Sequence, residues 1–224
     1  MLLRLSPENK RTLFICMTFG NVAYLGLPVI SQTLGASAIP STGLIVATYL
    51  FWTFTVGIGY LEHSLSRDAS TIARDIAKSL FKNPLLIAVI LGVTVSGFSL
   101  SLPALFLDTL TILKNSVTPL ILIVIGLFIG KSHMGNIREW ILVAGFCLLT
   151  LFILPTLFFL GLLALNLAPK DFAVSVILAA MPLAITAFAL ADTYQLNKTF
   201  IARTVVLSTL LSIVSLAFWI SILT

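Results

Sequence analysis

The longest uncharged stretch of the sequence runs from Thr12 to Leu61, fifty residues without Asp, Glu, Lys, Arg or His. A bilayer core about 30 Å thick needs roughly 20 mostly apolar residues per helix, so this stretch holds two spans. Across all 224 residues, 59% are hydrophobic and 9% are charged, and the mean hydropathy is +1.13. A soluble protein of this size would have too little polar surface to cover so many apolar residues. The composition therefore indicates an integral membrane protein and excludes a disordered tail, a nucleic-acid module and a disulfide-stapled secreted domain.

The remaining apolar runs predict five further spans. The segment from Gly35 to Ser41 is rich in helix breakers and therefore separates the first span from the second. The third span lies between Asn83 and about Ser99. The other four runs are about Ala104 to Gly130, Trp140 to Leu165, Phe172 to Ala191 and Phe200 to Leu223. The prediction is an all-α polytopic membrane protein with about seven transmembrane helices.

Lys and Arg residues gather on one side of the predicted membrane. The N-terminal segment, the connector after span two and the loops after spans four and six carry eleven of the 13. The opposite side carries only Lys170, and Lys114 lies within span four. Because cytoplasmic loops are rich in Lys and Arg, we expect a cytoplasmic N-terminus and an outside C-terminus, in the plasma membrane.

The connector from Glu62 to Lys82 has apolar residues at helical spacing on one face and charged residues on the other. This pattern predicts an amphipathic helix at the cytoplasmic membrane surface. Two interpretations stay open. The helix is either a surface connector that contacts anionic lipid or a site for a regulatory partner.

The sequence contains no motif of a hydrolytic enzyme. HExxH, GxSxG and a Gly-rich phosphate loop are absent, and His63 and His133 are predicted to lie in cytoplasmic loops. Cys16 and Cys147 lie within apolar runs without a CxxC motif, which is typical of small buried residues. We therefore expect no enzyme, no catalytic residue, no metal and no cofactor.

Two predicted spans contain helix-breaking residues near their middle. The first span has Gly26 and Pro28 shortly after Asn21, and the sixth has Pro182 shortly before Thr186. Proline cannot donate a backbone hydrogen bond, and glycine lowers the cost of unwinding. Irregular backbone at membrane depth is tolerated where it is buried in protein or lines a wet cavity, and paired interrupted spans point to a transporter site. The alternative is that each proline only makes a packing kink.

Motifs along the chain carry a family resemblance. The segment Asn21–Pro28 reads Asn-Val-Ala-Tyr-Leu-Gly-Leu-Pro, and later segments are 82–92, which contains Lys-Asn-Pro-Leu and Leu-Gly, then 119–126 and 181–194. The first segment resembles the N-x-x-x-[LI]-G-x-P motif of the auxin efflux carrier family. The three later segments resemble, in order, the start of that family's sixth helix, its seventh helix and its ninth helix. This family of permeases belongs to the bile acid, arsenite and riboflavin transporter superfamily.

The resemblance implies two five-helix inverted repeats whose fourth and ninth helices cross, unwound, at the substrate site. The chain resembles helices four to ten of the family, and no segment of it resembles the family's first three helices. We therefore expect an incomplete 5+5 transporter with two broken crossover helices. Residues 1–61 would hold the end of the first repeat, 62–83 the amphipathic connector and 84–224 the second repeat.

The predicted substrate site draws on both breaks and on span four. Glycine and the prolines would shape the backbone, while amide and hydroxyl groups would supply hydrogen bonds. Asn115 and Thr118, just before Pro119, are neutral polar groups that could orient a ligand. The predicted substrate-binding residues are Asn21, Gly26, Pro28, Asn115, Thr118, Pro182 and Thr186.

Charged residues within or near the spans have two interpretations each. Asp108 and Lys114 lie six residues apart, about 240° around a helix, and so do not pair on one face. Lys114 either extends to the outer interface or faces the substrate. Asp192 lies either at the cytoplasmic end of span six or in a proton relay.

The predicted function is that of a permease moving a small organic solute, an organic anion, by alternating access. Half-helix N-termini carry positive partial charge and suit a carboxylate. The expected partners are this anion, the lipid bilayer, a coupling ion such as sodium and a second copy in a homodimer, but no nucleic acid. Two alternatives stay open: a seven-helix membrane receptor or sensor, and a non-transporting fragment or accessory subunit.

Overall fold

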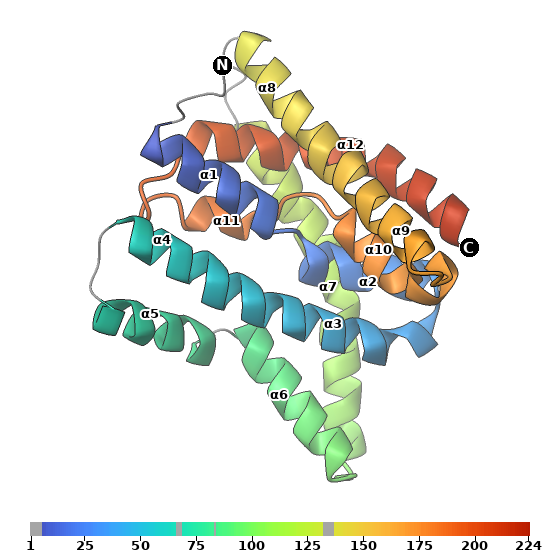
Figure 1. Ribbon diagram of the computed structural model, residues 1–224. Coiled ribbons are helices and arrows are strands. Elements are labelled where there is room, and N and C mark those ends of the chain that lie inside the picture. Colours follow the sequence, from blue (N-terminus) through green and yellow to red (C-terminus); the bar gives the residue numbers. More distant parts are fainter. Residues whose placement is uncertain (1–5, 66–68, 83, 132–136) are drawn as a thin grey trace.

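The computed structural model describes residues 6–65, 69–82, 84–131 and 137–224 (Figure 1). Within these ranges all named elements are helical, and one isolated backbone bridge is present. Lipid cannot form hydrogen bonds with backbone N–H and C=O groups, whereas a helix pairs these groups internally. The predicted all-α membrane fold is confirmed.

The predicted first span consists of two half-helices. The break between them covers residues 19–21. Gly35 then takes a φ of +85°, which suits glycine, in the turn between the first and second predicted spans. The elements of this part are α1 (Pro7–Thr18), the π-helical turn η1 (Val22–Gly26), α2 (Leu27–Thr33) and the 3₁₀ turn η2 (Ala36–Ala38).

The second predicted span is continuous and leads into the connector. It continues beyond Leu61 through Glu62 and His63, both predicted to lie in the connector, and Glu62 is only 1% exposed. The amphipathic helix is present, but it begins only after this span ends. The elements are α3 (Ile39–Trp52), the π-helical turn η3 (Thr53–Gly57), α4 (Ile58–Ser64) and α5 (Ala69–Phe81).

The second half of the chain contains another interrupted span. Residues 180–185 are not helical and separate two short helices. The last helix is capped by Asn197, whose side-chain oxygen accepts a hydrogen bond from the backbone N–H of Phe200. The elements are α6 (Pro84–Gly97), α7 (Ala104–Lys131), α8 (Ile137–Leu148), η4 (Leu149–Ile153), α9 (Leu154–Ala164), η5 (Pro169–Phe172), α10 (Ala173–Ala179), α11 (Thr186–Ala189) and α12 (Lys198–Leu223).

Three described helical segments are long and apolar enough to cross a membrane by length and composition. They are Ala36–Ser64, Trp140–Ala164 and Lys198–Leu223, and they match the predicted second, fifth and seventh spans. The 28-residue α7, about 42 Å long, matches the fourth. The predicted third span corresponds to α6. Its 14 residues extend about 21 Å, which is shorter than a full membrane crossing.

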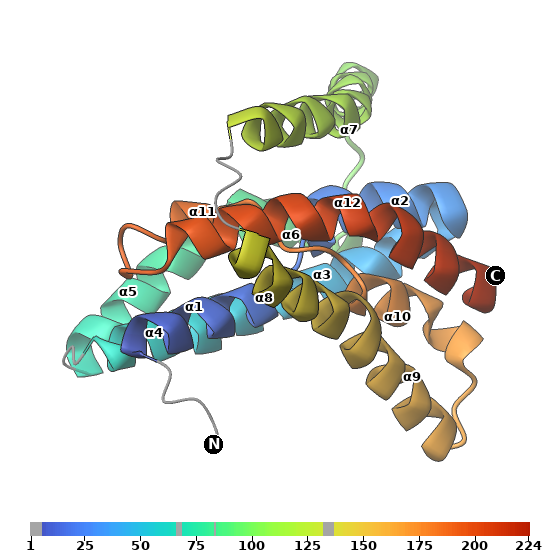
Figure 2. The same ribbon diagram turned by 90° about the horizontal axis from the view of Figure 1, so that it is seen from above.

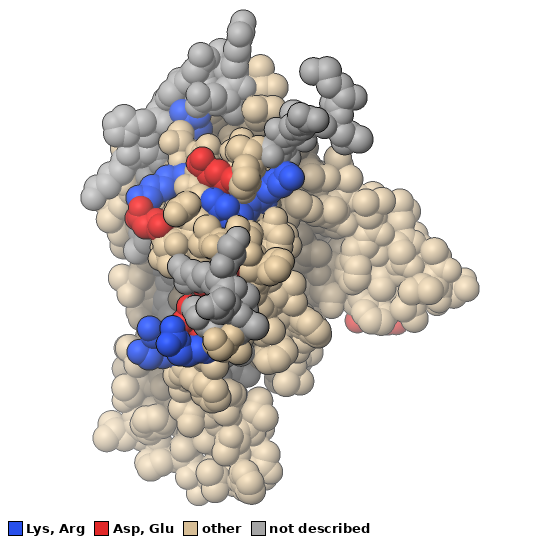
Figure 3. Space-filling model, turned by 60° about the vertical axis from the view of Figure 1, so that its left-hand side comes forward, with Lys and Arg blue, Asp and Glu red and all other residues tan. Residues whose placement is uncertain are grey.

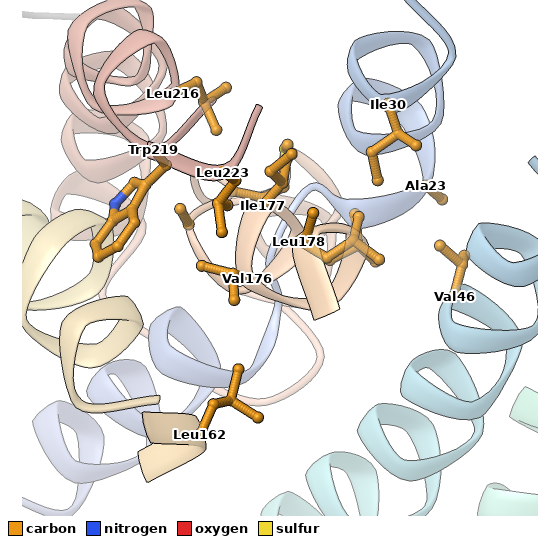
Figure 4. Packing of buried hydrophobic residues seen from close by; sticks show 14 of the residues in the cluster. Ala23, Ile30, Val46, Leu162, Val176, Ile177, Leu178, Leu216, Trp219 and Leu223 are labelled. Carbon is orange, nitrogen blue, oxygen red and sulfur yellow. The ribbon is translucent and has the colours of Figure 1, made fainter. Parts of the chain in front are cut away.

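A buried apolar cluster joins the N-terminal and C-terminal parts of the chain (Figure 4). The cluster contains Trp219 and Leu216 on α12, Ile177 and Leu178 on α10, and Val46 on α3. Cys16 and Cys147 are buried and unpaired, as small hydrophobic residues would be. This packing fixes α10 against α3 and α12, next to both breaks.

The outer surface is largely apolar. On the face shown in Figure 3, most charged side chains gather on one part, and wide areas of the rest carry none; many large hydrophobic side chains of the protein are exposed. Figure 2 shows α7 lying to one side of the other helices, with contacts to η1 and α12. Extended exposed apolar surface of this kind fits contact with lipid.

Candidate functional site

The two helix breaks cross each other. The backbone N–H of Asn21 donates to the carbonyl oxygen of Pro182 at 2.7 Å, and the N–H of Ala184 donates to that of Phe19 at 2.8 Å. These bonds flank an isolated antiparallel bridge between residues 20 and 183. Each break therefore satisfies part of the unwound backbone of the other, as buried polar groups require.

Two hydroxyl groups supply further hydrogen bonds at the crossing. The N–H of Gly20 donates to Oη of Tyr49 at 2.6 Å, and Tyr49 Oη donates to the carbonyl oxygen of Thr18. The N–H of Leu183 donates to Oγ of Ser208 at 3.1 Å. The backbone at the crossing is thus held by side chains from α3 and α12 as well as by the opposite break.

The first break lies earlier in the chain than predicted. The sequence points to Gly26 and Pro28, but the backbone leaves the helix at residues 19–21. Pro28 is the second residue of α2, and because η1 and α2 form one uninterrupted helical run, its missing N–H falls inside that run and does not end it. The π-helical turn η1 ends directly before α2, and such turns are where a helix adjusts its hydrogen bonding.

Gly26 allows close packing rather than unwinding. A Cβ atom at this position would lie 2.6 Å from Cδ2 of Leu178 on α10. Gly26 itself has a helical φ of −62°. Its role in the structure is therefore to bring η1 close to α10.

A cavity of about 150 Å³ lies beside the crossing. Its polar wall residues are Asn21, Tyr24, Tyr49, Thr53 and Thr186, and none of its described wall residues is charged. Pockets for drug-sized ligands have volumes of about 300–1,000 Å³. The volume therefore suits a small solute.

Asn21 is the most enclosed polar side chain of this wall. It is 5% exposed, and its side-chain oxygen has no hydrogen-bond partner among the described residues. The backbone N–H groups of Val22, Ala23 and Tyr24, which begin η1 and line the cavity, also lack an acceptor in the described part. An unpaired buried polar group costs about 1–3 kcal/mol, so a ligand or water in the cavity would stabilise this end of η1.

Comparison with known proteins places the chain in a family. A family model described as "Membrane transport protein" matches residues 66–220, which include the second break. The chain belongs to this membrane transport protein family. An uncharacterized transporter from Methanocaldococcus jannaschii is 26% identical over 224 residues, covering 96% of this chain and 69% of the relative. The predicted membership of the auxin efflux carrier family is confirmed.

The two predicted site residues of span four in this membrane transport protein are not placed in the cavity wall by the described side chains. Asn115 is exposed on α7 and is not part of the cavity wall. Thr118 also lies on α7, but its side chain is outside the described residues. The structure therefore brings Asn21, Pro182 and Thr186 together, and the assignment of the two α7 residues stays a prediction.

The two acidic residues predicted to lie within or near the spans are not part of the cavity wall. Asp108 is exposed on α7, as is Lys114. Asp192 is exposed in the segment after α11 and forms an ion pair with Lys198 at the start of α12. Neither acidic residue belongs to the cavity wall.

Sequence reasoning missed four hydroxyl residues of the site. Tyr24, Tyr49 and Thr53 line the cavity, and Ser208 binds the second break from α12. Hydroxyl residues are common on these apolar helices, with Thr48 next to Tyr49 and Thr209 next to Ser208, so the sequence does not single these positions out. The only sequence signal is the position of Tyr49 and Ser208 on the long helices that follow the breaks.

Proposed function

We propose that this membrane transport protein is a secondary transporter that moves a small organic anion by alternating access around the crossing. The observation that carries the proposal is the antiparallel pairing of two helix breaks beside a cavity. Interrupted helices that meet at a cavity are typical of substrate sites in secondary transporters. In the resembling family, this crossing is where the substrate binds.

The charge of the proposed substrate follows from the groups that face the cavity. Three backbone N–H groups of η1 are unpaired within the described part, and no Asp or Glu belongs to the wall. The N-terminal end of a helix carries positive partial charge and binds carboxylates and phosphates. The amide of Asn21 adds a neutral hydrogen-bonding group that can orient such an anion.

The remaining features of the proposal come from the sequence. The charge distribution predicts a cytoplasmic N-terminus and an outside C-terminus, and we propose that the membrane is the plasma membrane. Two inverted repeats, each with one broken helix, would surround the site, and the protein would act as a homodimer. The driving force would be the membrane potential or a sodium ion, because no carboxylate lies in the cavity wall to carry a proton.

Uptake of labelled small carboxylates into vesicles reconstituted with the purified chain tests the proposal. Asn21→Ala should raise KM about ten- to a hundred-fold, the range for a lost hydrogen bond to a charged group. Gln32→Ala is the matched control, because Gln32 is an exposed amide on α2 outside the cavity wall. An unchanged KM in Asn21→Ala would contradict a site at the crossing.

Two other outcomes would favour the alternatives. Carboxylate binding without uptake in the unaltered protein would favour a receptor or sensor. Uptake that requires an added partner subunit would favour an accessory role.

The proposed coupling has its own test. Asp108→Asn and Asp192→Asn should leave the pH dependence of uptake unchanged, because neither residue lies in the cavity wall. Uptake would be measured across pH 5 to 8, with and without a sodium gradient. Loss of the pH dependence in Asp192→Asn would show that this carboxylate carries the coupling proton.

A further inference from the structure

The crossing leaves two backbone N–H groups that the opposite break cannot satisfy. In an antiparallel pair flanked by two ladder hydrogen bonds, the N–H groups of the paired residues point away from each other. Here the paired residues are Gly20 and Leu183, and the flanking bonds are donated by Asn21 and Ala184. The outward N–H groups therefore need acceptors from other elements.

A hydroxyl group supplies the acceptor on each side. Gly20 N–H lies 2.6 Å from Oη of Tyr49 on α3, and Leu183 N–H lies 3.1 Å from Oγ of Ser208 on α12. Each hydroxyl comes from the long helix that follows its break, 29 residues on in the first case and 25 in the second. The two halves of the site thus use the same arrangement.

Both hydroxyls also donate, so each joins two backbone groups. Tyr49 Oη donates to the carbonyl oxygen of Thr18, and Ser208 Oγ donates to that of Val205 at 3.4 Å. Their surroundings differ, because Tyr49 lines the cavity whereas Ser208 is 1% exposed and lies outside its wall. Ser208 can therefore act on a ligand only through the backbone that it holds.

We infer that Tyr49 and Ser208 are positioning residues of the transport site, which fix the crossing against α3 and α12. The inference rests on the proposed function, since the crossing matters for transport only if the substrate binds there. Fixing Gly20 and Leu183 also fixes Asn21 and Ala184, the next residues of the two breaks and both part of the cavity wall. Preorganised groups of this kind bind a ligand without the cost of ordering them first.

Amide hydrogen exchange tests the two contacts directly. In the solubilised full chain, Tyr49→Phe should speed exchange of the Gly20 N–H about ten-fold, as expected for one lost hydrogen bond, and leave Leu183 unchanged. Ser208→Ala should do the converse, and Ser208→Thr, which keeps the hydroxyl, should restore slow exchange. NMR resolves the two amides.

Matched controls remove a hydroxyl of the same type away from the breaks. Tyr60→Phe alters a tyrosine of α4 whose ring packs at a tilt against Phe14, and Ser212→Ala alters a buried serine one turn along α12 from Ser208. Both controls should leave the exchange of Gly20 and Leu183 as it is in the unaltered protein.

Uptake kinetics in vesicles separate positioning from stability. Tyr49→Phe and Ser208→Ala should each raise the KM for a labelled carboxylate several-fold, because the cavity wall loses its fixed geometry. Loss of folded protein alone lowers the maximal rate and leaves KM unchanged. The two control variants should keep the KM of the unaltered protein.

Each result decides between the alternatives. Unchanged exchange at both amides overturns the inference, whether or not the protein transports. Faster exchange with an unchanged KM overturns the positioning role and leaves the hydroxyls a role in stability alone. If the unaltered protein takes up no carboxylate, the proposed function fails, and the exchange rates still decide whether the hydroxyls hold the breaks.

Discussion

At the scale of single residues, two helix glycines have opposite surroundings. A Cβ at Gly26 would lie 2.6 Å from Cδ2 of Leu178, whereas a Cβ at Gly43 in α3 would meet nothing within 4 Å. We expect Gly26→Ala to destabilise the protein by about 1–3 kcal/mol through overpacking. Gly43→Ala should stabilise it by about 0.5–1 kcal/mol, because alanine favours the helix. Thermal unfolding in detergent measures both.

A double variant checks the cause. In Leu178→Ala the side chain that Gly26→Ala would contact is shortened, so the two changes together should cost less than their sum. Equal effects at the two glycines, or strict additivity with Leu178→Ala, would contradict a close approach of η1 to α10.

At the scale of elements, the two prolines have different positions. Pro28 lies in the first turn of α2, whereas Pro182 lies between α10 and α11, where its carbonyl accepts from Asn21. Pro182→Ala would let α10 extend, and we expect uptake to fall about ten-fold or more, since an interior proline changes helix stability by about 3 kcal/mol. Pro28→Ala should keep most of the uptake, because a helix forms at that position with either residue.

The measurement is uptake in vesicles, paired with thermal unfolding of the same variants. Pro40→Ala, in the first turn of α3, is the control for a proline at a helix start. An inactive Pro28→Ala together with an active Pro182→Ala would place the functional break at Pro28 after all.

At the scale of the whole molecule, the positions of Lys and Arg predict the orientation in the membrane. Eleven of the 13 lie on one predicted side, so a reporter fused after Thr224 should be active outside, and one inserted near Ser70 in α5 should be active inside. Protease protection in sealed vesicles provides a second measurement. A C-terminal reporter that is active inside would mean that the number of crossings is even, with α6 as the first candidate for a segment that does not span.

The sequence by itself determined the class of the protein and the presence of the breaks. The uncharged run from Thr12 to Leu61 requires membrane helices, and Pro182 cannot continue a helix, because both effects depend on the local chain alone. The amphipathic α5 and the turn at Gly35 were predictable for the same reason.

The tertiary structure alone decided which backbone groups meet. It moved the first break from Pro28 to residues 19–21, left Asn115 outside the cavity wall and placed Tyr49 and Ser208 at the crossing. The contact of Arg11 was also beyond sequence-based prediction, because its buried guanidinium donates to the carbonyl oxygen of Tyr194, 183 residues away. Hydropathy and proline chemistry act over a few residues, whereas these hydrogen bonds depend on how distant helices pack.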